Sequence, residues 1–282
     1  MKTRVISAIV GIGILAVVLS FYETPVFLVA VCLVSMLAVY ELLHSTKLVT
    51  NRFVLVWSLL YAGFIPFFFT IRSKEIGIPV STLFVAGLCF SLLRWHEELT
   101  VQSMASAFTF SILVPCSISV LVMFREIYPQ MGIFYLFLVL LGAWGSDTGA
   151  YFTGKAFGKK KLCPNISPNK TVEGFIGGLV TATLCYLALG VIFTYLTPIL
   201  HPGYQLTVNY LELLLVAPFC SASGVLGDLF ASVIKRQTGI KDYGNIMPGH
   251  GGVMDRFDSV LFVSPTLFLL VKVLPPAFVS AM

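Results

Sequence analysis

Four aspartates in the second half of the sequence could do chemistry, because they lie within or beside long apolar stretches. They are Asp147, Asp228, Asp255 and Asp258. A carboxylate at membrane depth costs roughly 3 kcal/mol, so it is expected to face a protein interior or a water-filled cavity and to have a partner. Clustered carboxylates repel one another unless a cation lies among them, and oxygen ligands without His or Cys favour Mg²⁺, Mn²⁺ or Ca²⁺. The pattern therefore predicts that these aspartates bind a divalent metal ion.

Basic residues and glycines accompany the aspartates in the segment SVIKRQTGIKDYGNIMPGHGGVMDRFD, residues 232–258. Glycine turns at Gly249, Gly251 and Gly252 allow the backbone to approach a ligand closely. A divalent metal ion combined with Lys, Arg and glycine turns is typical of phosphate handling, in which the protein supplies positioning and charge neutralisation. No GxxxxGK[ST] motif is present, so a P-loop nucleotide site is not expected. The basic residues next to the aspartates are Lys170, Lys235, Arg236, Lys241 and Arg256.

Simpler roles compete with catalysis for several residues of this kind. A single Asp near a helix end is commonly a cap or a snorkelling surface residue, although four together are harder to explain in that way. The run Lys159–Lys161 fits anchoring to lipid head groups. His250 could act as a general base, donate to a phosphate or only fix its loop. Gly174 and Gly178 have the spacing of close helix packing.

The composition identifies the chain as a membrane protein. Of its 282 residues, 57% are hydrophobic and 11% are charged, whereas soluble domains contain roughly 25% charged residues. The mean hydropathy is +0.93. The six cysteines form no CxxC pair and no zinc-binding spacing, which indicates packing roles. The net charge of +5 suits anionic head groups and soluble phosphates, and no nucleic-acid partner is expected.

Apolar runs of suitable length predict an all-α, polytopic fold with about nine transmembrane helices. An odd number of spans places the termini on opposite sides of the membrane, and the excess of Lys and Arg indicates the cytoplasmic side. With a cytoplasmic N-terminus, 14 of the 18 Lys and Arg fall inside, and the site of the four aspartates faces the cytoplasm. The runs lie near residues 5–21, 25–43, 53–71, 78–93, 104–124, 131–151, 174–197, 210–230 and 258–274.

The two halves of the chain differ in polar content. Residues 1–130 have short connections and are predicted to form an N-terminal transmembrane scaffold of about five helices. Residues 131–282 hold seven of the 13 acidic residues. They are predicted to form the catalytic transmembrane region, with about four helices and cytoplasmic loops at 152–173 and 231–257.

The segment 232–258 closely resembles the signature of the phosphatidate cytidylyltransferases, also called CDP-diacylglycerol synthases. That signature reads S-x-x-K-R, four variable residues, K-D, and then P-x-H-G-G-x-x-D-R-x-D, and every fixed position is filled here. The segment 145–178, GSDTGAYFTGKAFGKKKLCPNISPNKTVEGFIGG, resembles a second stretch of the same family. Together the two stretches cover about a fifth of the chain.

The resemblance implies a Mg²⁺-dependent enzyme of phospholipid biosynthesis. Such an enzyme transfers the cytidylyl group of CTP to phosphatidic acid, giving CDP-diacylglycerol and pyrophosphate. The lipid phosphate supplies its own nucleophilic oxygen, so no Ser, Cys or His nucleophile is required. The chain is short, with little beyond its spans, which is typical of a bacterial protein, and we expect it to be integral to the cytoplasmic (inner) membrane with membrane lipids around it. The resemblance also suggests a homodimer. Whether a monovalent ion or a second divalent ion joins Mg²⁺ is left open.

Roles can be carried over to the residues that match the family pattern. Asp228 and Asp255 are the leading metal ligands, followed by Asp258 and Asp147. The residues expected to bind substrate are Ser167, Lys170, Thr171, Ser232, Gly251 and Gly252. The residues expected to contribute to catalysis are Lys235, Arg236, Lys241, Asp242, His250 and Arg256.

Two other classes of protein remain as alternatives. One is another membrane lipid-phosphate enzyme, such as a CTP-dependent polyprenol kinase or a prenyltransferase that binds diphosphate through Mg²⁺. The other is a transporter or ion channel, which is less favoured because the charges cluster on one side and no inverted repeat is visible.

Overall fold

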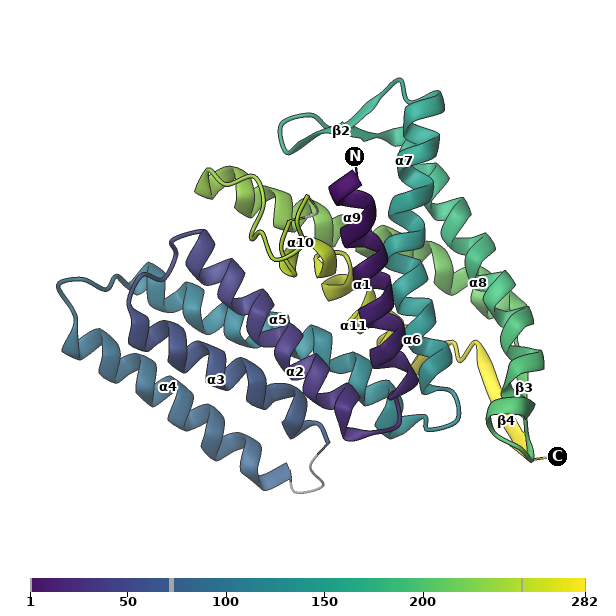
Figure 1. Ribbon diagram of the computed structural model, residues 1–282, viewed down its shortest axis with the longest axis horizontal. Helices are drawn as coiled ribbons and strands as arrows, with labels where there is room; N and C mark the ends of the chain where they lie inside the picture. The colour runs from purple at the N-terminus through teal and green to yellow at the C-terminus, as the bar shows by residue number, and fades with distance from the viewer. Residues whose placement is uncertain (1, 71–73, 250, 282) are drawn as a thin grey trace. The chain divides into compact units, whose positions relative to one another are not determined.

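The computed structural model describes residues 2–70, 74–249 and 251–281, and helices make up most of them (Figure 1). The helices are α1 (Lys2–Ser20), α2 (Pro25–Tyr40), α3 (Arg52–Phe68), α4 (Gly77–Arg94), α5 (Val101–Ile127), α6 (Gly132–Leu140), α7 (Ser146–Phe157), α8 (Val172–Leu200), α9 (Tyr210–Thr238), α10 (Met254–Phe257) and α11 (Val260–Val273). Two π-helical segments, η1 (Glu41–Ser45) and η3 (Leu141–Gly145), and one 3₁₀ turn, η2 (Lys74–Ile76), adjoin them.

Strands are few and short. They are β1 (Lys161–Cys163), β2 (Ser167–Thr171), β3 (Tyr204–Val208) and β4 (Ala277–Ala281). β1 pairs with β2 and β3 pairs with β4, both antiparallel. The predicted all-α, polytopic fold class is therefore confirmed, with two small two-stranded sheets added to it.

The predicted apolar runs coincide with helical segments, although not all of these are long. Among the described residues, six helical stretches are long and apolar enough to cross a membrane. They are Pro25–Ser45, Gly77–Arg94, Val101–Ile127, Gly132–Phe157, Val172–Leu200 and Tyr210–Thr238. The apolar parts of α1 and α3 are shorter, and α11 has 14 residues. The count of nine spans thus stays a prediction.

Polar residues mark where several helices begin. The Thr24 hydroxyl accepts from Val26 N at 3.3 Å before α2, and the Asn51 side chain accepts from Phe53 N at 3.0 Å before α3. Thr171 does the same for α8, accepting from Gly174 N at 3.0 Å. Such caps satisfy amide groups that have no partner within the helix, so they fix the starting residue of each helix.

Contacts divide the chain into two compact units. The first unit comprises Met1–Met123 and Ile234–Phe257, and the second comprises Phe124–Val233 and Asp258–Met282. Helix α9 is continuous across the boundary, so its last turns belong to the first unit. The predicted division near residue 130 concerns function and stays a prediction.

In the first unit, the later part of the segment 232–258 packs with helices from the N-terminal part of the chain. Helices α2, α3 and α4 pack successively, with Tyr61 stacked on Phe84 at 4.0 Å between ring centroids. Helix α10 packs against α2. We call residues 239–249 and 251–253, between α9 and α10, the signature loop.

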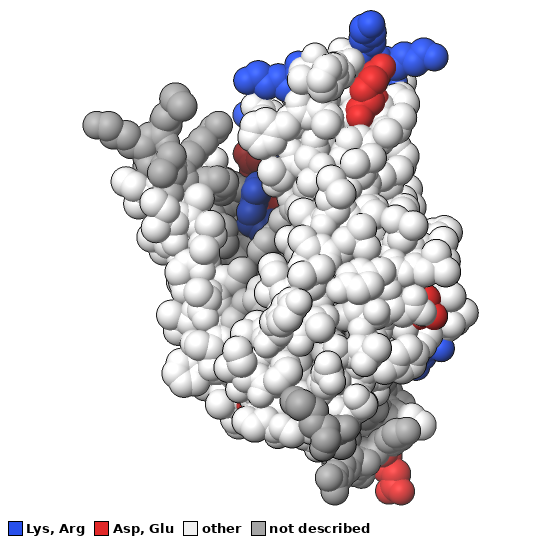
Figure 2. All heavy atoms as spheres, turned by 90° about the vertical axis from the view of Figure 1, so that its right-hand side faces the viewer, with Lys and Arg blue, Asp and Glu red and all other residues white. Residues whose placement is uncertain are grey.

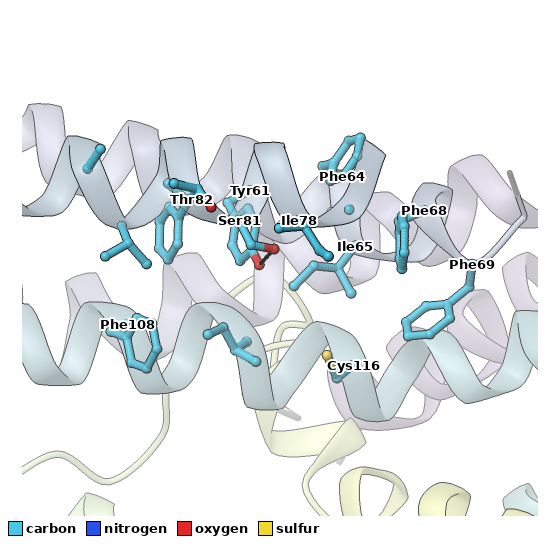
Figure 3. A pocket seen from close by; sticks show the side chains of 15 residues that line it. Tyr61, Phe64, Ile65, Phe68, Phe69, Ile78, Ser81, Thr82, Phe108 and Cys116 are labelled. Carbon is cyan, nitrogen blue, oxygen red and sulfur yellow. Dashed lines mark hydrogen bonds between the residues drawn. The ribbon is translucent and has the colours of Figure 1, made fainter. Parts of the chain in front are cut away.

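The first unit also contains an apolar pocket of about 780 Å³ among α3, α4 and α5 (Figure 3). Aromatic rings, including Phe64, Phe68 and Phe108, line it, and the hydroxyls of Tyr61 and Ser81 lie 2.8 Å apart beside it. None of the predicted site residues lines this pocket. Its mostly apolar lining suits hydrocarbon chains better than a charged substrate group.

The second unit is organised by close packing of α7 along α8. A methyl group on Gly174 would lie 2.8 Å from the Ala150 carbonyl oxygen, and one on Gly178 would lie 3.0 Å from that of Ser146. These distances leave no room for side chains, so the predicted close packing at the two glycines is confirmed. The packing fixes the start of α7, where Asp147 lies.

The β1–β2 hairpin lies beyond the apolar part of the second unit. Figure 2 shows a face that is mostly free of charged side chains, with Lys and Arg gathered at its upper end, where Figure 1 places the hairpin. Lys159, Lys160 and Lys161 are exposed in this region. An apolar surface ending in exposed lysines is what a helix leaving a bilayer presents to head groups.

Candidate active site

Asp255 makes several hydrogen bonds within the predicted site. It lies in the short helix α10 and is buried, with 9% of its surface exposed. Its Oδ1 accepts from Lys235 Nζ at 2.9 Å, and its Oδ2 accepts from Tyr243 N at 2.8 Å and from Gly252 N at 3.0 Å. Three donors, one of them charged, fix the carboxylate and draw both ends of the signature loop towards it.

Lys235 is held on two sides near the end of α9. Besides its ion pair with Asp255, its ammonium lies 5.4 Å from the centre of the buried Tyr243 ring. Both contacts fix the position of the ammonium group. A phosphate that uses Lys235 must share it with Asp255.

Glycines are required where the signature loop turns. Gly249 and Gly251 have φ of 79° and 86°, in the left-handed region that favours glycine. A side chain on Gly251 would also lie 2.7 Å from Asp255 Oδ2. Met247 N donates to Gly251 O at 3.0 Å and closes the turn. His250, a predicted catalytic residue, lies outside the described residues.

Glu41 contacts the same loop and is a residue that the sequence reasoning missed. It begins the π-helical segment η1 and is 2% exposed. Its Oε2 accepts from Met254 N at 2.8 Å. The signal that singled out Asp147 and Asp228, an acidic residue at the end of an apolar run, applies equally to Glu41.

In the second unit, Asp228 forms an ion pair with Lys170. Asp228 lies on α9 and Lys170 on β2, so the pair joins α9 to the segment 145–178 within this unit. The Ser232 hydroxyl is one turn further along α9, 3.5 Å from Asp228 Oδ1. The side chains of Asp228 and Lys170 are 25% and 23% exposed, but the Lys170 Nζ atom itself is buried against Asp228.

Asp147 and Asp258 meet at one serine, also in the second unit. The Ser259 hydroxyl donates to Asp147 Oδ2 at 3.2 Å, and Ser259 N donates to Asp258 Oδ1 at 2.7 Å. The backbone of Asp258 in turn lies directly against Gly227, so no side chain fits at that glycine. Three carboxylate-bearing segments, at the start of α7, on α9 and before α11, therefore come together in this unit.

The other loop of the predicted site is organised by its own hydrogen bonds. Thr171 is 8% exposed, and its hydroxyl is used to cap α8. The Glu173 carboxylate accepts from Lys159 N at 3.0 Å and from Lys160 N at 3.2 Å. Ser167 is half-buried in β2. These contacts shape the loop, and the predicted substrate contacts of Ser167 and Thr171 stay predictions.

The remaining charged residues of the predicted site are exposed. They are Arg236, Lys241, Asp242 and Arg256. Exposure leaves the three basic residues of this set accessible to a soluble polyanion.

The donor set fits a metal ion whose coordination shell is completed by substrate. Within residues 2–70, 74–249 and 251–281, no three His, Cys, Asp or Glu side chains lie close enough to hold a metal ion by themselves. Mg²⁺ is usually bound through one or two carboxylates plus substrate phosphates and water. Asp147, Asp228 and Asp258 supply oxygen donors of this kind in the second unit, and Mg²⁺ binding by them stays a prediction.

Comparison with known proteins gives a consistent set of relatives. The sequence profile of the Cytidylyltransferase family matches residues 2–274. A protein of Thermotoga maritima named phosphatidate cytidylyltransferase is 33% identical over 277 residues, which is 97% of each chain. The protein of that name from Haemophilus influenzae is 32% identical over 287 residues, covering 94% of this chain and 96% of its own. The protein of that name from Bacillus subtilis is 51% identical over 141 residues, which is 50% of this chain and 48% of that protein.

Proposed function

The chain belongs to the cytidylyltransferase family, and on this premise we propose that it transfers the cytidylyl group of CTP to phosphatidic acid. The products are CDP-diacylglycerol and pyrophosphate. The observation that carries the proposal is the relation to the Thermotoga maritima phosphatidate cytidylyltransferase, because it extends over 97% of both chains.

The chemistry requires charge management and no covalent enzyme intermediate. A phosphate oxygen of phosphatidic acid attacks the α-phosphorus of CTP, forming the new P–O bond. The bond from the α-phosphorus to the bridging oxygen breaks, and pyrophosphate leaves with that electron pair. Two polyanions must be brought together, so the protein's contribution is positioning and neutralisation of charge.

The lysines of the two ion pairs are suited to this work. Lys170 and Lys235 are each paired with an aspartate, so each ammonium is already oriented and partly desolvated. A phosphate oxygen that takes Lys170 leaves the Asp228 carboxylate available to a cation. The exposed Arg236, Lys241 and Arg256 supply further positive charge for the triphosphate.

Mg²⁺ is part of the proposal. Asp147, Asp228 and Asp258 would hold it, with Asp255 as a further predicted ligand. When bound, Mg²⁺ neutralises charge that develops on the leaving pyrophosphate. Asp255 has a second task in any case, because its carboxylate already organises the signature loop.

We place the active site at the cytoplasmic face of the inner membrane. The multiple apolar helices are those of an integral membrane protein. The bacterial relatives and the location of CTP in the cytoplasm support this membrane and this face. The lipid substrate would enter sideways from the bilayer, because its acyl chains favour hydrocarbon over water.

The test is a reconstituted assay with purified protein in lipid nanodiscs. With CTP, phosphatidic acid and Mg²⁺, we expect equal amounts of pyrophosphate and CDP-diacylglycerol. One arm omits phosphatidic acid and another replaces it with a polyprenol. Release of CDP with formation of polyprenyl phosphate in the last arm, and no product with phosphatidic acid, would assign the chain to the polyprenol kinases instead.

A further inference from the structure

Glu41 is buried in the first unit, far along the sequence from the residues that it contacts. It is separated from Met254 by 213 positions, yet its Oε2 accepts from Met254 N at 2.8 Å. Only 2% of Glu41 is exposed. Burying a carboxylate is costly unless it is hydrogen-bonded, so Glu41 is not explained as an ordinary solvated surface residue.

Two glycines of the signature loop lie directly against the Glu41 carboxylate. A side chain on Gly244 or on Gly252 would overlap the Glu41 carboxylate oxygens. Neither glycine has the positive φ that would by itself require glycine. The close approach to Glu41 is therefore the physical reason for glycine at both positions.

Glu41 and Asp255 both bind backbone of the signature loop and of the adjoining start of α10. Tyr243 N and Gly252 N donate to Asp255. Glu41 contacts Gly252 itself, and it also contacts Gly244, which follows Tyr243, and Met254, which lies two residues after Gly252. Met254 also begins α10 immediately before Asp255. Moving Glu41 would therefore displace the amides that orient Asp255, and with them its partner Lys235.

The local helix geometry supports a dedicated role. Glu41 is the first residue of η1, a π-helical segment that follows α2. Such segments re-aim a side chain relative to the regular helix and occur frequently at functional sites. Here the re-aimed side chain is the one that reaches α10.

We propose that Glu41 is a positioning residue for the reaction: it accepts the Met254 amide and thereby sets the placement of Asp255 and Lys235. The inference rests on the proposed function. It assigns Glu41 no contact with substrate. The required feature is an acceptor oxygen at this position, which glutamine retains and alanine does not.

The first test compares Glu41→Gln and Glu41→Ala with wild type in the cytidylyltransfer assay. We expect Glu41→Ala to lower kcat about 100-fold, as small displacements of catalytic groups do, and Glu41→Gln to lower it less than about tenfold. The matched control is Glu97→Ala, an exposed acidic residue of the same unit, with unchanged kcat. Wild-type turnover by Glu41→Ala, or equal losses in both variants, would overturn the inference.

A second test uses Gly244, one of the two glycines that lie against the Glu41 carboxylate. We expect Gly244→Ala to lower kcat at least about tenfold in the wild-type background, but less than about threefold in the Glu41→Ala background, because the overlapping carboxylate is gone. Additive losses would contradict the proposal.

Hydrogen exchange separates this inference from the proposed function. In Glu41→Ala, and not in Glu41→Gln, the amides of Tyr243, Gly252 and Met254 should exchange faster. If wild-type protein made no CDP-diacylglycerol, the proposed function would fail. The exchange result would still decide the contact role, and unchanged exchange in Glu41→Ala would reject it.

Discussion

At the scale of single residues, Asp255 has to satisfy several demands with one carboxylate. A carboxylate has about four acceptor positions, and Lys235, Tyr243 and Gly252 use three of Asp255's. A metal ion on Asp255 must take the remaining position or displace Lys235. The loop-organising role and the metal-binding role of Asp255 are therefore in competition.

Asp255→Asn should remove nearly all activity. The amide nitrogen cannot accept from the loop, and Lys235 is left without its counter-charge in a largely buried place. We expect turnover to fall at least about 100-fold and the protein to lose about 3 kcal/mol of stability. Turnover and the melting temperature of purified protein in detergent measure the two effects. Wild-type turnover by well-folded Asp255→Asn protein would remove both roles at once.

Removal of divalent cations should stop the reaction. We expect excess EDTA to abolish product formation and added Mg²⁺ to restore it. Asp228→Asn should raise the Mg²⁺ concentration for half-maximal rate about tenfold or more, since a ligand is lost. Lys170→Met is the comparison, because it removes the ion-pair partner and keeps the carboxylate. Full activity in EDTA would show that Asp147, Asp228 and Asp258 serve another purpose.

Residue types were predictable at this scale, but their pairings were not. Cost of burial singles out Asp147 and Asp228 in an apolar sequence, and the charge of Lys170 and Lys235 identifies them as phosphate binders. Which lysine meets which aspartate depends on the fold. Glu41 satisfied the same burial criterion, yet its partner lies 213 positions away, where no local pattern points.

At the scale of elements, the start of α8 offers a test between capping and substrate binding. Thr171→Ala removes the hydroxyl that accepts from Gly174 N, and should cost about 1 kcal/mol of stability. Thr171→Ser retains the cap and should behave as wild type. Thermal unfolding and KM for CTP are the measurements. A raised KM for CTP without any loss of stability would favour substrate binding over capping.

Helices were more predictable than the irregular segments between them. A long apolar run forms a helix in a bilayer because every backbone amide must be paired within the segment. The run near 131–151 nevertheless contains η3, and the loop 152–173 folds into the β1–β2 hairpin. Both depend on contacts with α8, which hydropathy does not report.

At the scale of the whole molecule, orientation across the membrane can be tested with Cys163. It lies in β1 and is partly exposed, in the loop predicted to be cytoplasmic. A membrane-impermeant thiol reagent should label it in inside-out vesicles and not in intact spheroplasts. Cys163→Ser gives the background from the exposed Cys89. Labelling in intact spheroplasts would reverse the predicted orientation.

Composition was sufficient to predict the class of the whole molecule. With 57% hydrophobic residues gathered in long apolar runs, the sequence favours spanning helices among the structures that a bilayer permits. The division by contacts was not predictable. Residues 234–257 lie in sequence between the two parts of the second unit but belong with the first 123 residues. Long-range packing of this kind leaves no periodic pattern in the sequence.

The contact between Glu41 and Met254 also determines when, during synthesis, the signature loop can become ordered. A ribosome adds about 5 to 20 residues per second, so Met254 is made about 10 to 40 s after Glu41. Throughout that interval the nascent chain already carries α2, while the amide that Glu41 will bind does not yet exist. Newly made protein therefore acquires an ordered signature loop only late in synthesis, and pulse-labelled chains should become resistant to proteolysis near residue 244 only after residue 254 has left the ribosome.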